Sequence, residues 1–217
     1  MALVLHAHPF SSYCQKVLIA LYENDTPFTM RLLADADSFA ELAKLWPLRL
    51  MPVLTDDGEA VREASIIIEH LMLRQPGPLR LIPSNPGAAL KVRFLDRLFD
   101  NYVMGPMQRV VSDALRGAGE RDPKGVADAK TRLDMAYEWL NGELEGRTWA
   151  AGEAFTLADC AAAPALFYAD WVHPIAEKFG SVRAYRARLL KRPSFARAVE
   201  EARPYRAFFP PGAPDRD

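Results

Sequence analysis

The sequence lacks several features that would assign it to a class at once. It has two cysteines, Cys14 and Cys160, in 217 residues, too few for a disulfide framework. Its 27 basic and 28 acidic residues leave a net charge of −1, so no excess of positive charge attracts nucleic acid or an anionic membrane surface. The most apolar stretch, Leu157 to Val172, contains Asp159 and Asp170 and is shorter than the roughly 20 residues that span a bilayer.

The start of the chain also lacks the marks of a secretory signal. Met1-Ala2-Leu3-Val4-Leu5-His6 has neither a positively charged segment nor a long apolar core. Together with the low cysteine count, this favours the reduced cytoplasm. We therefore expect a soluble, cytoplasmic protein that binds neither nucleic acid nor membrane. Half of its residues are apolar, enough at this length for one large core or two small ones.

The first third of the chain alternates between strand and helix patterns. Strand, helix, strand and helix are predicted over residues 3–5, 13–23, 29–33 and 37–45, and then two strands and a helix over 52–55, 59–62 and 65–73. Asp56-Asp57-Gly58 is a strong hairpin signal between the last two strands. The first three elements predict a right-handed βαβ unit. The result is an α/β domain of order βαβαββα.

A cluster of prolines and glycines predicts a domain boundary. Gln75 to Gly87 contains four prolines and two glycines in thirteen residues, which the interior of a helix or strand does not tolerate. Beyond it only helical spacing recurs, over residues 88–115, 127–144, 156–171, 182–190 and 193–202. We predict an all-α helical bundle and place the domains at residues 1–77 and 87–217.

The first candidate site lies where the first strand runs into the first helix. The segment Pro9-Phe10-Ser11-Ser12-Tyr13-Cys14 places hydroxyl groups at a helix N-terminus. Unpaired backbone N–H groups and the helix dipole favour an anion there, and Ser11 is the candidate to face it. The alternative is that Ser11 or Ser12 only caps the helix.

Two further segments carry groups suited to a peptide ligand. Pro52 opens a predicted strand; if the Met51–Pro52 bond is cis, the backbone of Met51 can pair with an extended peptide, and the alternative is a trans proline at a strand edge. Ahead of the third helix, Glu63 can accept from an ammonium while the helix N–H groups receive a carboxylate. Ser65 as a simple cap is the alternative there. Together, these segments suggest a pocket for a peptide with an α-amino acid end and a thiolate.

The order of these motifs resembles the cytosolic glutathione S-transferase family over essentially the whole chain. The resemblance to its thioredoxin-like domain is carried by Ser11-Ser12-Tyr13-Cys14, Lys16-Val17, Met51-Pro52-Val53-Leu54 and Asp57-Gly58 leading to Glu63. Phe155-Thr156-Leu157-Ala158-Asp159 resembles the capping box and staple that open the family's buried core helix. In that box Thr156 and Asp159 can exchange bonds, and Phe155 can pack on Cys160.

The resemblance implies a serine-type bacterial transferase that acts on glutathione as co-substrate, with a role in detoxification. Ser11 would be catalytic, donating a hydrogen bond to the glutathione sulfur and stabilising the thiolate that attacks an electrophile. The electrophile would lie between the domains, against Tyr102 and Met107, with residues 205–209 as a lid. A homodimer is implied, and no metal is required. The implied glutathione-binding residues are Phe10, Arg49, Met51, Pro52, Glu63, Ala64 and Ser65.

Two departures from the family pattern keep other functions open. Ala64 stands where many members have Ser, and Leu50 stands where Lys or Gln is frequent, with Arg49 beside it as a substitute. A glutathione-dependent isomerase, a dehalogenase, or a non-catalytic binding protein of the same fold are the alternatives. Cys14 occupies the second cysteine position of a C-x-x-C frame that lacks the first, so a dithiol cycle is excluded and a packed thiol is expected; Cys160 is also expected in the core.

Overall fold

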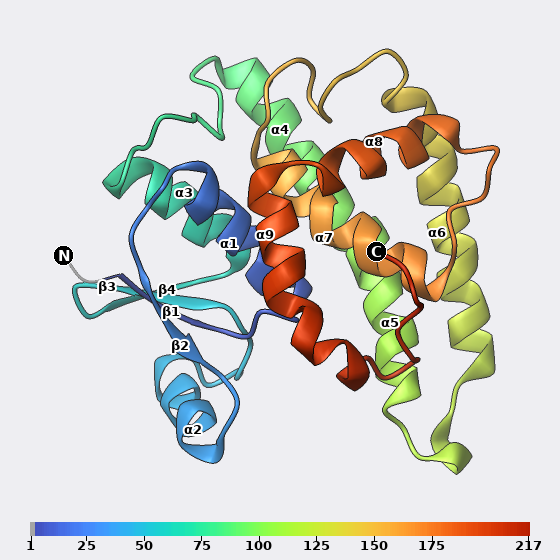
Figure 1. Ribbon diagram of the computed structural model, residues 1–217, viewed down its shortest axis with the longest axis horizontal. Coiled ribbons are helices and arrows are strands. Elements are labelled where there is room, and N and C mark those ends of the chain that lie inside the picture. The colour runs from blue at the N-terminus through green and yellow to red at the C-terminus, as the bar shows by residue number, and fades with distance from the viewer. Residues whose placement is uncertain (1–2) are drawn as a thin grey trace.

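The computed structural model describes residues 3–217, so residues 1 and 2 of the predicted first domain lie outside the described residues. An α/β unit and a helical unit lie side by side (Figure 1). The predicted order βαβαββα is confirmed, with most ends displaced by one or two residues. Its elements are β1 (Leu3–Ala7), α1 (Ser12–Glu23), β2 (Thr29–Leu32), α2 (Ala36–Leu45), β3 (Val53–Asp56), β4 (Glu59–Arg62) and α3 (Ala64–Arg74).

The four strands form one mixed sheet of order β2-β1-β3-β4. Strand β1 is parallel to β2 and antiparallel to β3, and β3 and β4 form the predicted hairpin. Its turn residues Asp57 and Gly58 have φ of +47° and +89°, the positive values that a two-residue turn of this hand requires. Helix α2 lies on the opposite side of the sheet from α1 and α3 (Figure 1), where Leu42 packs with Leu33 and Val53.

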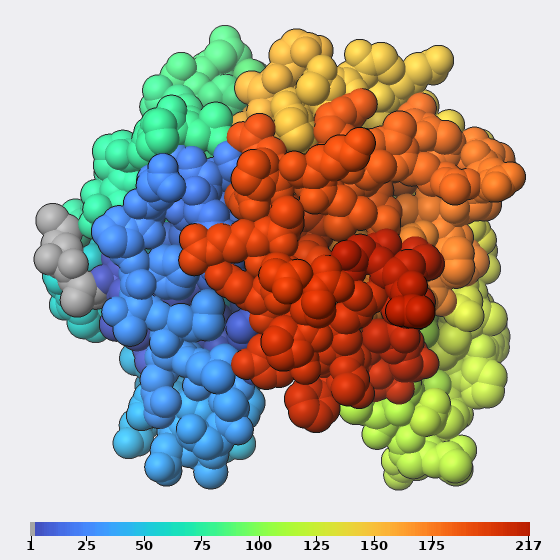
Figure 2. Space-filling view, in the orientation of Figure 1, coloured from blue at the N-terminus to red at the C-terminus, as the bar shows by residue number. Residues whose placement is uncertain are grey.

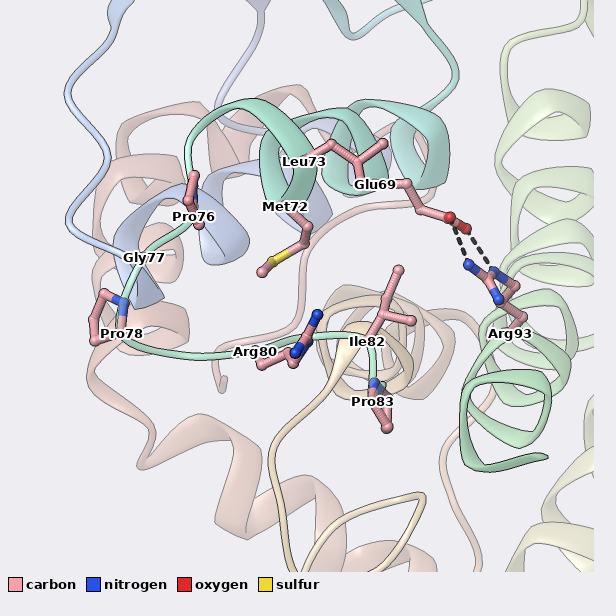
Figure 3. Close-up of a pocket in the computed structure, with 10 residues that line it drawn as sticks. All are labelled: Glu69, Met72, Leu73, Pro76, Gly77, Pro78, Arg80, Ile82, Pro83 and Arg93. Atoms are coloured by element: carbon pink, nitrogen blue, oxygen red, sulfur yellow. Dashed lines mark hydrogen bonds and ion pairs between the residues drawn. The ribbon is translucent and has the colours of Figure 1, made fainter. Parts of the chain in front are cut away.

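The second unit is helical, as predicted. The chain reaches it through a linker that runs between α3 and α4 (Figure 3), where Arg93 of α4 makes a two-bond ion pair with Glu69 of α3, at 2.7 and 2.8 Å. The elements of the helical unit are α4 (Pro86–Leu98), η1 (Phe99–Met104), α5 (Gly105–Ala114), η2 (Ala118–Glu120), α6 (Pro123–Glu143), α7 (Leu157–Val172), α8 (Gly180–Leu190), α9 (Pro193–Ala202) and η3 (Arg203–Phe208). The exact division at residues 77 and 87 stays a prediction.

The helix predicted over residues 88–115 is interrupted by a π-helical turn, η1, between α4 and α5. Pro106 has no N–H, and in a regular α-helix its ring would crowd the carbonyl of Tyr102. The chain widens here, and the N–H of Gly105 bonds to the carbonyl of Asp100, five residues earlier. The spacing of apolar residues carries no signal for such a turn, so the sequence predicted one continuous helix.

Helix α7 forms the centre of the molecule, and all sixteen of its residues are buried. At its start Asp159 accepts hydrogen bonds from the backbone N–H and the hydroxyl of Thr156, at 2.8 and 3.0 Å, which confirms the bond that Asp159 returns in the predicted capping box. Phe155 lies edge-on to Trp149, and its staple contact with Cys160 stays a prediction. Within residues 3–217, no helix is both long and apolar enough to span a membrane.

The two cysteines lie inside this core. Cys14 on α1 and Cys160 on α7 are fully buried, as the sequence predicted. Burial raises the pKa of Cys14 to about 11 and the pKa of Cys160 well above its ordinary value. Both are therefore protonated, unreactive thiols near neutral pH, because the thiolate is the nucleophilic form.

A buried ion cluster joins the two units. The ammonium of Lys16 on α1 has no exposed surface and lies 2.5 Å from Asp96 Oδ1 and 2.7 Å from Asp100 Oδ2. It also donates to the Ser65 hydroxyl of α3 at 2.9 Å. Arg97 contacts both carboxylates, at 2.9 and 2.5 Å, so two positive and two negative charges balance. The cluster therefore ties α1 and α3 to α4 and η1.

We predict that Lys16→Met lowers the free energy of unfolding by about 3–5 kcal/mol, because it leaves two buried carboxylates with one counter-charge. Chemical denaturation measures the change. Lys124→Met is the matched control: it breaks an exposed pair with Asp128 and should change stability by about 0.5 kcal/mol or less. Equal losses in the two variants would show that the buried cluster is not needed for stability.

Candidate functional site

Two adjoining hollows lie where the two units meet, and they share Tyr13, Leu50 and Met51. The first, which we call the α3 hollow, has a volume of about 260 Å³ and is lined by Tyr13, Trp46, Leu50, Met51, Pro52, Glu63, Ala64, Arg97, Asp100 and Asn101. The second, the interdomain cleft, has about 400 Å³ and is lined by Phe10, Ser11, Ser12, Tyr13, Arg49, Leu50, Met51, Met107, Gln108, Val111, Tyr168, Phe208, Phe209 and Pro210. Both therefore draw residues from the two units.

Four of the predicted binding residues line the α3 hollow: Met51, Pro52, Glu63 and Ala64. The Met51–Pro52 bond is cis, which decides between the two alternatives that the sequence left open. Glu63 has φ of +72°, a left-handed conformation that costs a non-glycine residue about 1 kcal/mol or more. It precedes α3, and its side chain makes no capping hydrogen bond within the described chain. The exposed Glu63 carboxylate and the first N–H groups of α3 are therefore available to a ligand.

Ser65 is placed differently from the other predicted binding residues. Its hydroxyl accepts from Lys16 Nζ and donates to Asp96 Oδ2, both at 2.9 Å. It belongs to the buried ion cluster and is not among the residues that line the α3 hollow. The one-residue offset from Ala64 turns the hydroxyl toward α4, since neighbouring side chains on a helix point about 100° apart.

Arg49, Phe10, Met107 and Tyr102 divide between two other hollows. Arg49, Phe10 and Met107 line the interdomain cleft. Arg49 thus lies beside the α3 hollow and not in it. Tyr102 lies in a separate hollow of about 300 Å³ next to Arg109 and Arg132, so of the two residues predicted for the electrophile, the structure places only Met107 in the cleft with Ser11.

Ser11 is the N-cap of α1, and its Oγ accepts from the N–H of Cys14 at 3.4 Å. The capping alternative is therefore correct for Ser11, and it is compatible with a site role because the hydroxyl can accept with one lone pair and still donate its proton. Ser12 is buried and accepts from Gln108 Nε2 at 3.3 Å. Each hydroxyl thus accepts one hydrogen bond, and Ser11 is the less buried of the two serines.

Tyr13 lines both hollows, together with Leu50 and Met51, and it is the titratable residue of the three. Burial, with a smaller contribution from the Asp100 carboxylate, raises the pKa of Tyr13 to about 12. Its phenol therefore stays protonated near neutral pH and can act only as a neutral hydrogen-bond donor or acceptor. This makes Tyr13 the rival to Ser11 for contact with an anion at the junction of the hollows.

Several residues of the cleft wall were not predicted from the sequence. Gln108 and Val111 lie on α5 beside Met107. Val111 follows Met107 by four residues and Gln108 by three, and this helical spacing was the one signal in the sequence that could have indicated a shared face. Tyr168 comes from α7, and Phe209 stacks on it with ring centroids 6.0 Å apart. The predicted lid segment begins at Tyr205, whose ring meets His8 edge-on at 4.5 Å. The C-terminal segment therefore closes one side of the cleft.

Comparison with known proteins agrees with this geometry. Residues 5–79 match the "Glutathione S-transferase, N-terminal domain" family and residues 98–193 match the "Glutathione S-transferase, C-terminal domain" family. FtsZ-localized protein A of Caulobacter vibrioides is 27% identical over 201 residues, 88% of each chain. A probable maleylacetoacetate isomerase of Vibrio cholerae is 25% identical over 213 residues, 94% of this chain and 98% of that one.

A solved structure covers nearly the same length. The crystal structure of a glutathione S-transferase from Methylobacillus flagellatus with GSH bound has a TM-score of 0.83 and 26% identity to this chain, covering 91% of this chain and 98% of the other. The two matched domains follow one another in the same order as the α/β and helical units described above. The chain belongs to the glutathione S-transferase family.

Proposed function

We propose that this protein is a glutathione transferase that binds glutathione in the α3 hollow and activates its thiol for attack on a small electrophile in the interdomain cleft. The observation that carries the proposal is the position of Ser11. It lies at the N-terminus of α1 and lines the cleft beside Tyr13 and Met51, the residues at which the cleft meets the α3 hollow. A ligand thiol that reached this junction would meet both a hydroxyl and the positive end of a helix dipole.

The α3 hollow offers complementary groups to the γ-glutamyl end of glutathione. Glu63 can accept from the ammonium, while the N–H of Ala64 and the N-terminus of α3 can hold the carboxylate. Arg97 lines the same hollow with its guanidinium half exposed, although the carboxylates of Asp96 and Asp100 balance its charge. The backbone of Met51 would pair with the cysteinyl residue. The GSH bound in the Methylobacillus flagellatus enzyme supports this ligand.

Activation would proceed through hydrogen bonding to the sulfur. Lowering the pKa of the bound thiol by ~2 units requires about 2.7 kcal/mol, an amount that a charge-assisted hydrogen bond from Ser11 and a helix terminus can supply together. The thiol proton leaves to solvent, the thiolate forms a bond to the electrophilic carbon, and the leaving group departs with its electron pair. The aromatic wall formed by Tyr168 and Phe209 keeps this part of the cleft apolar.

We predict that Ser11→Ala lowers turnover with an activated aryl chloride by roughly ten- to a thousandfold. It should also return the pKa of bound glutathione, read from thiolate absorbance, toward that of the free thiol. Ser11→Gly separates catalysis from capping, because glycine caps a helix almost as well as serine but has no hydroxyl. Both variants should lose turnover equally.

The exposed Ser112 of α5 is the matched control, and Ser112→Ala should keep full turnover. Retained turnover in Ser11→Gly would mean that Ser11 serves only as a cap. A large loss in Tyr13→Phe with unchanged turnover in Ser11→Ala would assign the role to Tyr13.

Ala64 generates a second prediction, about affinity. Because the Ser65 hydroxyl is engaged by Lys16 and Asp96, the hollow has backbone N–H groups but no hydroxyl at this point of α3. Ala64→Ser should tighten reduced glutathione about three- to thirtyfold in calorimetric titration. Ala36→Ser, at the first residue of α2, is the matched control and should leave affinity unchanged. Equal or weaker binding in a folded Ala64→Ser variant would show that the γ-glutamyl end lies elsewhere.

Two other activities share the same site. A glutathione-dependent isomerase or dehalogenase would use the same thiolate, and the similarity to the Vibrio cholerae protein favours the isomerase of the two. A binding protein without catalysis is favoured by the engaged Ser65 and by Ala64, which both weaken the γ-glutamyl subsite. If reduced glutathione does not bind in the titration, the glutathione-dependent enzymes are excluded and the binding protein is favoured.

We also propose a cytoplasmic homodimer. Leu90 and Phe94 of α4 and Met135 and Trp139 of α6 are large apolar side chains with 42–70% of their surface exposed. Phe94 and Trp139 lie edge-on at 5.9 Å, and the spacing of four residues in each helix places all four on one continuous apolar face. A second copy of the chain would bury such a face.

The predicted mass in light scattering at micromolar concentration is twice that of one chain. Phe94→Asp should shift the mass toward one chain, because it places a charge in the buried face. Leu115→Asp is the matched control, since Leu115 is 72% exposed and lies at the end of α5. A wild-type mass of one chain would contradict the dimer.

A further inference from the structure

A further hollow lies on the helical unit, apart from the candidate site. It has a volume of about 470 Å³ and is lined by Asp170, Pro174, Ile175, Arg183, Arg186, Ala187 and Arg216. It is bounded by the end of α7, by α8 and by the C-terminal residues, which lie against that part of the surface in Figure 2 (dark red against orange). We call it the arginine hollow. Its lining has no residue in common with those of the α3 hollow or the interdomain cleft.

The charges in this lining do not balance. Three guanidinium groups face one carboxylate, that of Asp170. Asp170 Oδ1 accepts the N–H of Ile175 at 2.8 Å, and Oδ2 accepts from Arg216. Each oxygen of the carboxylate thus already accepts one hydrogen bond, from the backbone and from the C-terminal segment respectively. The lining carries a net charge of +2, counted from three arginines and one aspartate.

Arg186 is the least satisfied of the three arginines. Its side chain is 12% exposed, and Nη2 lies 3.3 Å from Asp170 Oδ2 without forming a hydrogen bond. Within residues 3–217, neither Nε nor Nη2 has a hydrogen-bond partner. A buried guanidinium with free donors is costly, and burial lowers the pKa of Arg186. Both nitrogens have almost no accessible surface, so an anion that enters the hollow satisfies these donors when the Arg186 side chain turns toward it.

Arg183 stands at the mouth of the hollow. Its side chain is half exposed, and its one ion pair, to the exposed Glu177, is long at 3.7 Å. An exposed pair of this length contributes little to stability. Arg183 is therefore free to turn toward a ligand.

We propose that the arginine hollow binds a small dianion, a phosphate monoester or a dicarboxylate. Arg186 holds one oxygen pair with its planar fork of donors, because guanidinium groups match the geometry of phosphate and carboxylate. Arg183 contacts the ligand from the mouth, and the two negative charges neutralise the surplus of the lining. The volume admits a small organic anion and not only an inorganic ion, since ligand pockets start at about 300 Å³.

Calorimetric titration of the whole chain with inorganic phosphate and, separately, with malonate tests the proposal at an ionic strength held constant with sodium chloride. Saturable binding of one ion per chain is expected for at least one probe. The probe that binds more tightly shows whether the ligand of this hollow is a phosphate monoester or a dicarboxylate. Arg183→Gln should weaken that binding at least about fivefold, and its exposed position keeps the fold intact, as circular dichroism will show.

Arg132→Gln is the matched control, because Arg132 is an exposed arginine that lines a different hollow. It removes the same charge and should leave binding unchanged. Arg186→Gln, if folded, should weaken binding more than Arg183→Gln. The proposal is overturned if neither probe binds, or if Arg183→Gln weakens binding no more than Arg132→Gln does.

Discussion

The buried ammonium of Lys16 is the contact on which the arrangement of the two units depends. It projects from the first helix of the α/β unit, and its carboxylate partners Asp96 and Asp100 belong to the helical unit. Such a group is tolerated away from water only when opposite charges surround it closely. The α3 hollow follows from this contact, because its walls combine Glu63 on one side with Arg97 and Asp100 on the other. The candidate site exists only when the units are docked.

Elements specified by neighbouring residues were predicted well from the sequence. The hairpin at Asp57 and Gly58 needs only its own backbone conformations, and the return bond from Asp159 to Thr156 spans three residues. The order of strands and helices follows from short hydrophobic periods. The position of Ser11 at the mouth of α1 was predicted for the same reason, since a helix start is a local signal.

Features that depend on residues far apart in the chain were not predicted. Lys16 lies in a segment that reads as an ordinary helix, and its burial depends on carboxylates 80 and 84 residues later in the sequence. Ser65 reads equally well as a cap or a ligand residue until α4 is placed beside it. Phe208, Phe209 and Pro210 line the cleft, and the lid over residues 205–209 was predicted from the family resemblance and not from the composition of this segment. Composition describes their local conformation and not their packing.

The π-helical turn between α4 and α5 sets how α5 is rotated about its axis relative to α4. Residues on either side of it are held by different parts of the molecule: Asp96 and Asp100 by Lys16, and Met107 and Gln108 by the wall of the cleft. If Phe99–Met104 formed a regular α-helix with no residue removed, everything that follows would rotate by roughly 100°; the wider turn absorbs one residue and prevents this rotation. The helical phase, and with it the side chains offered to a substrate, is thus set by a single extra residue in one turn.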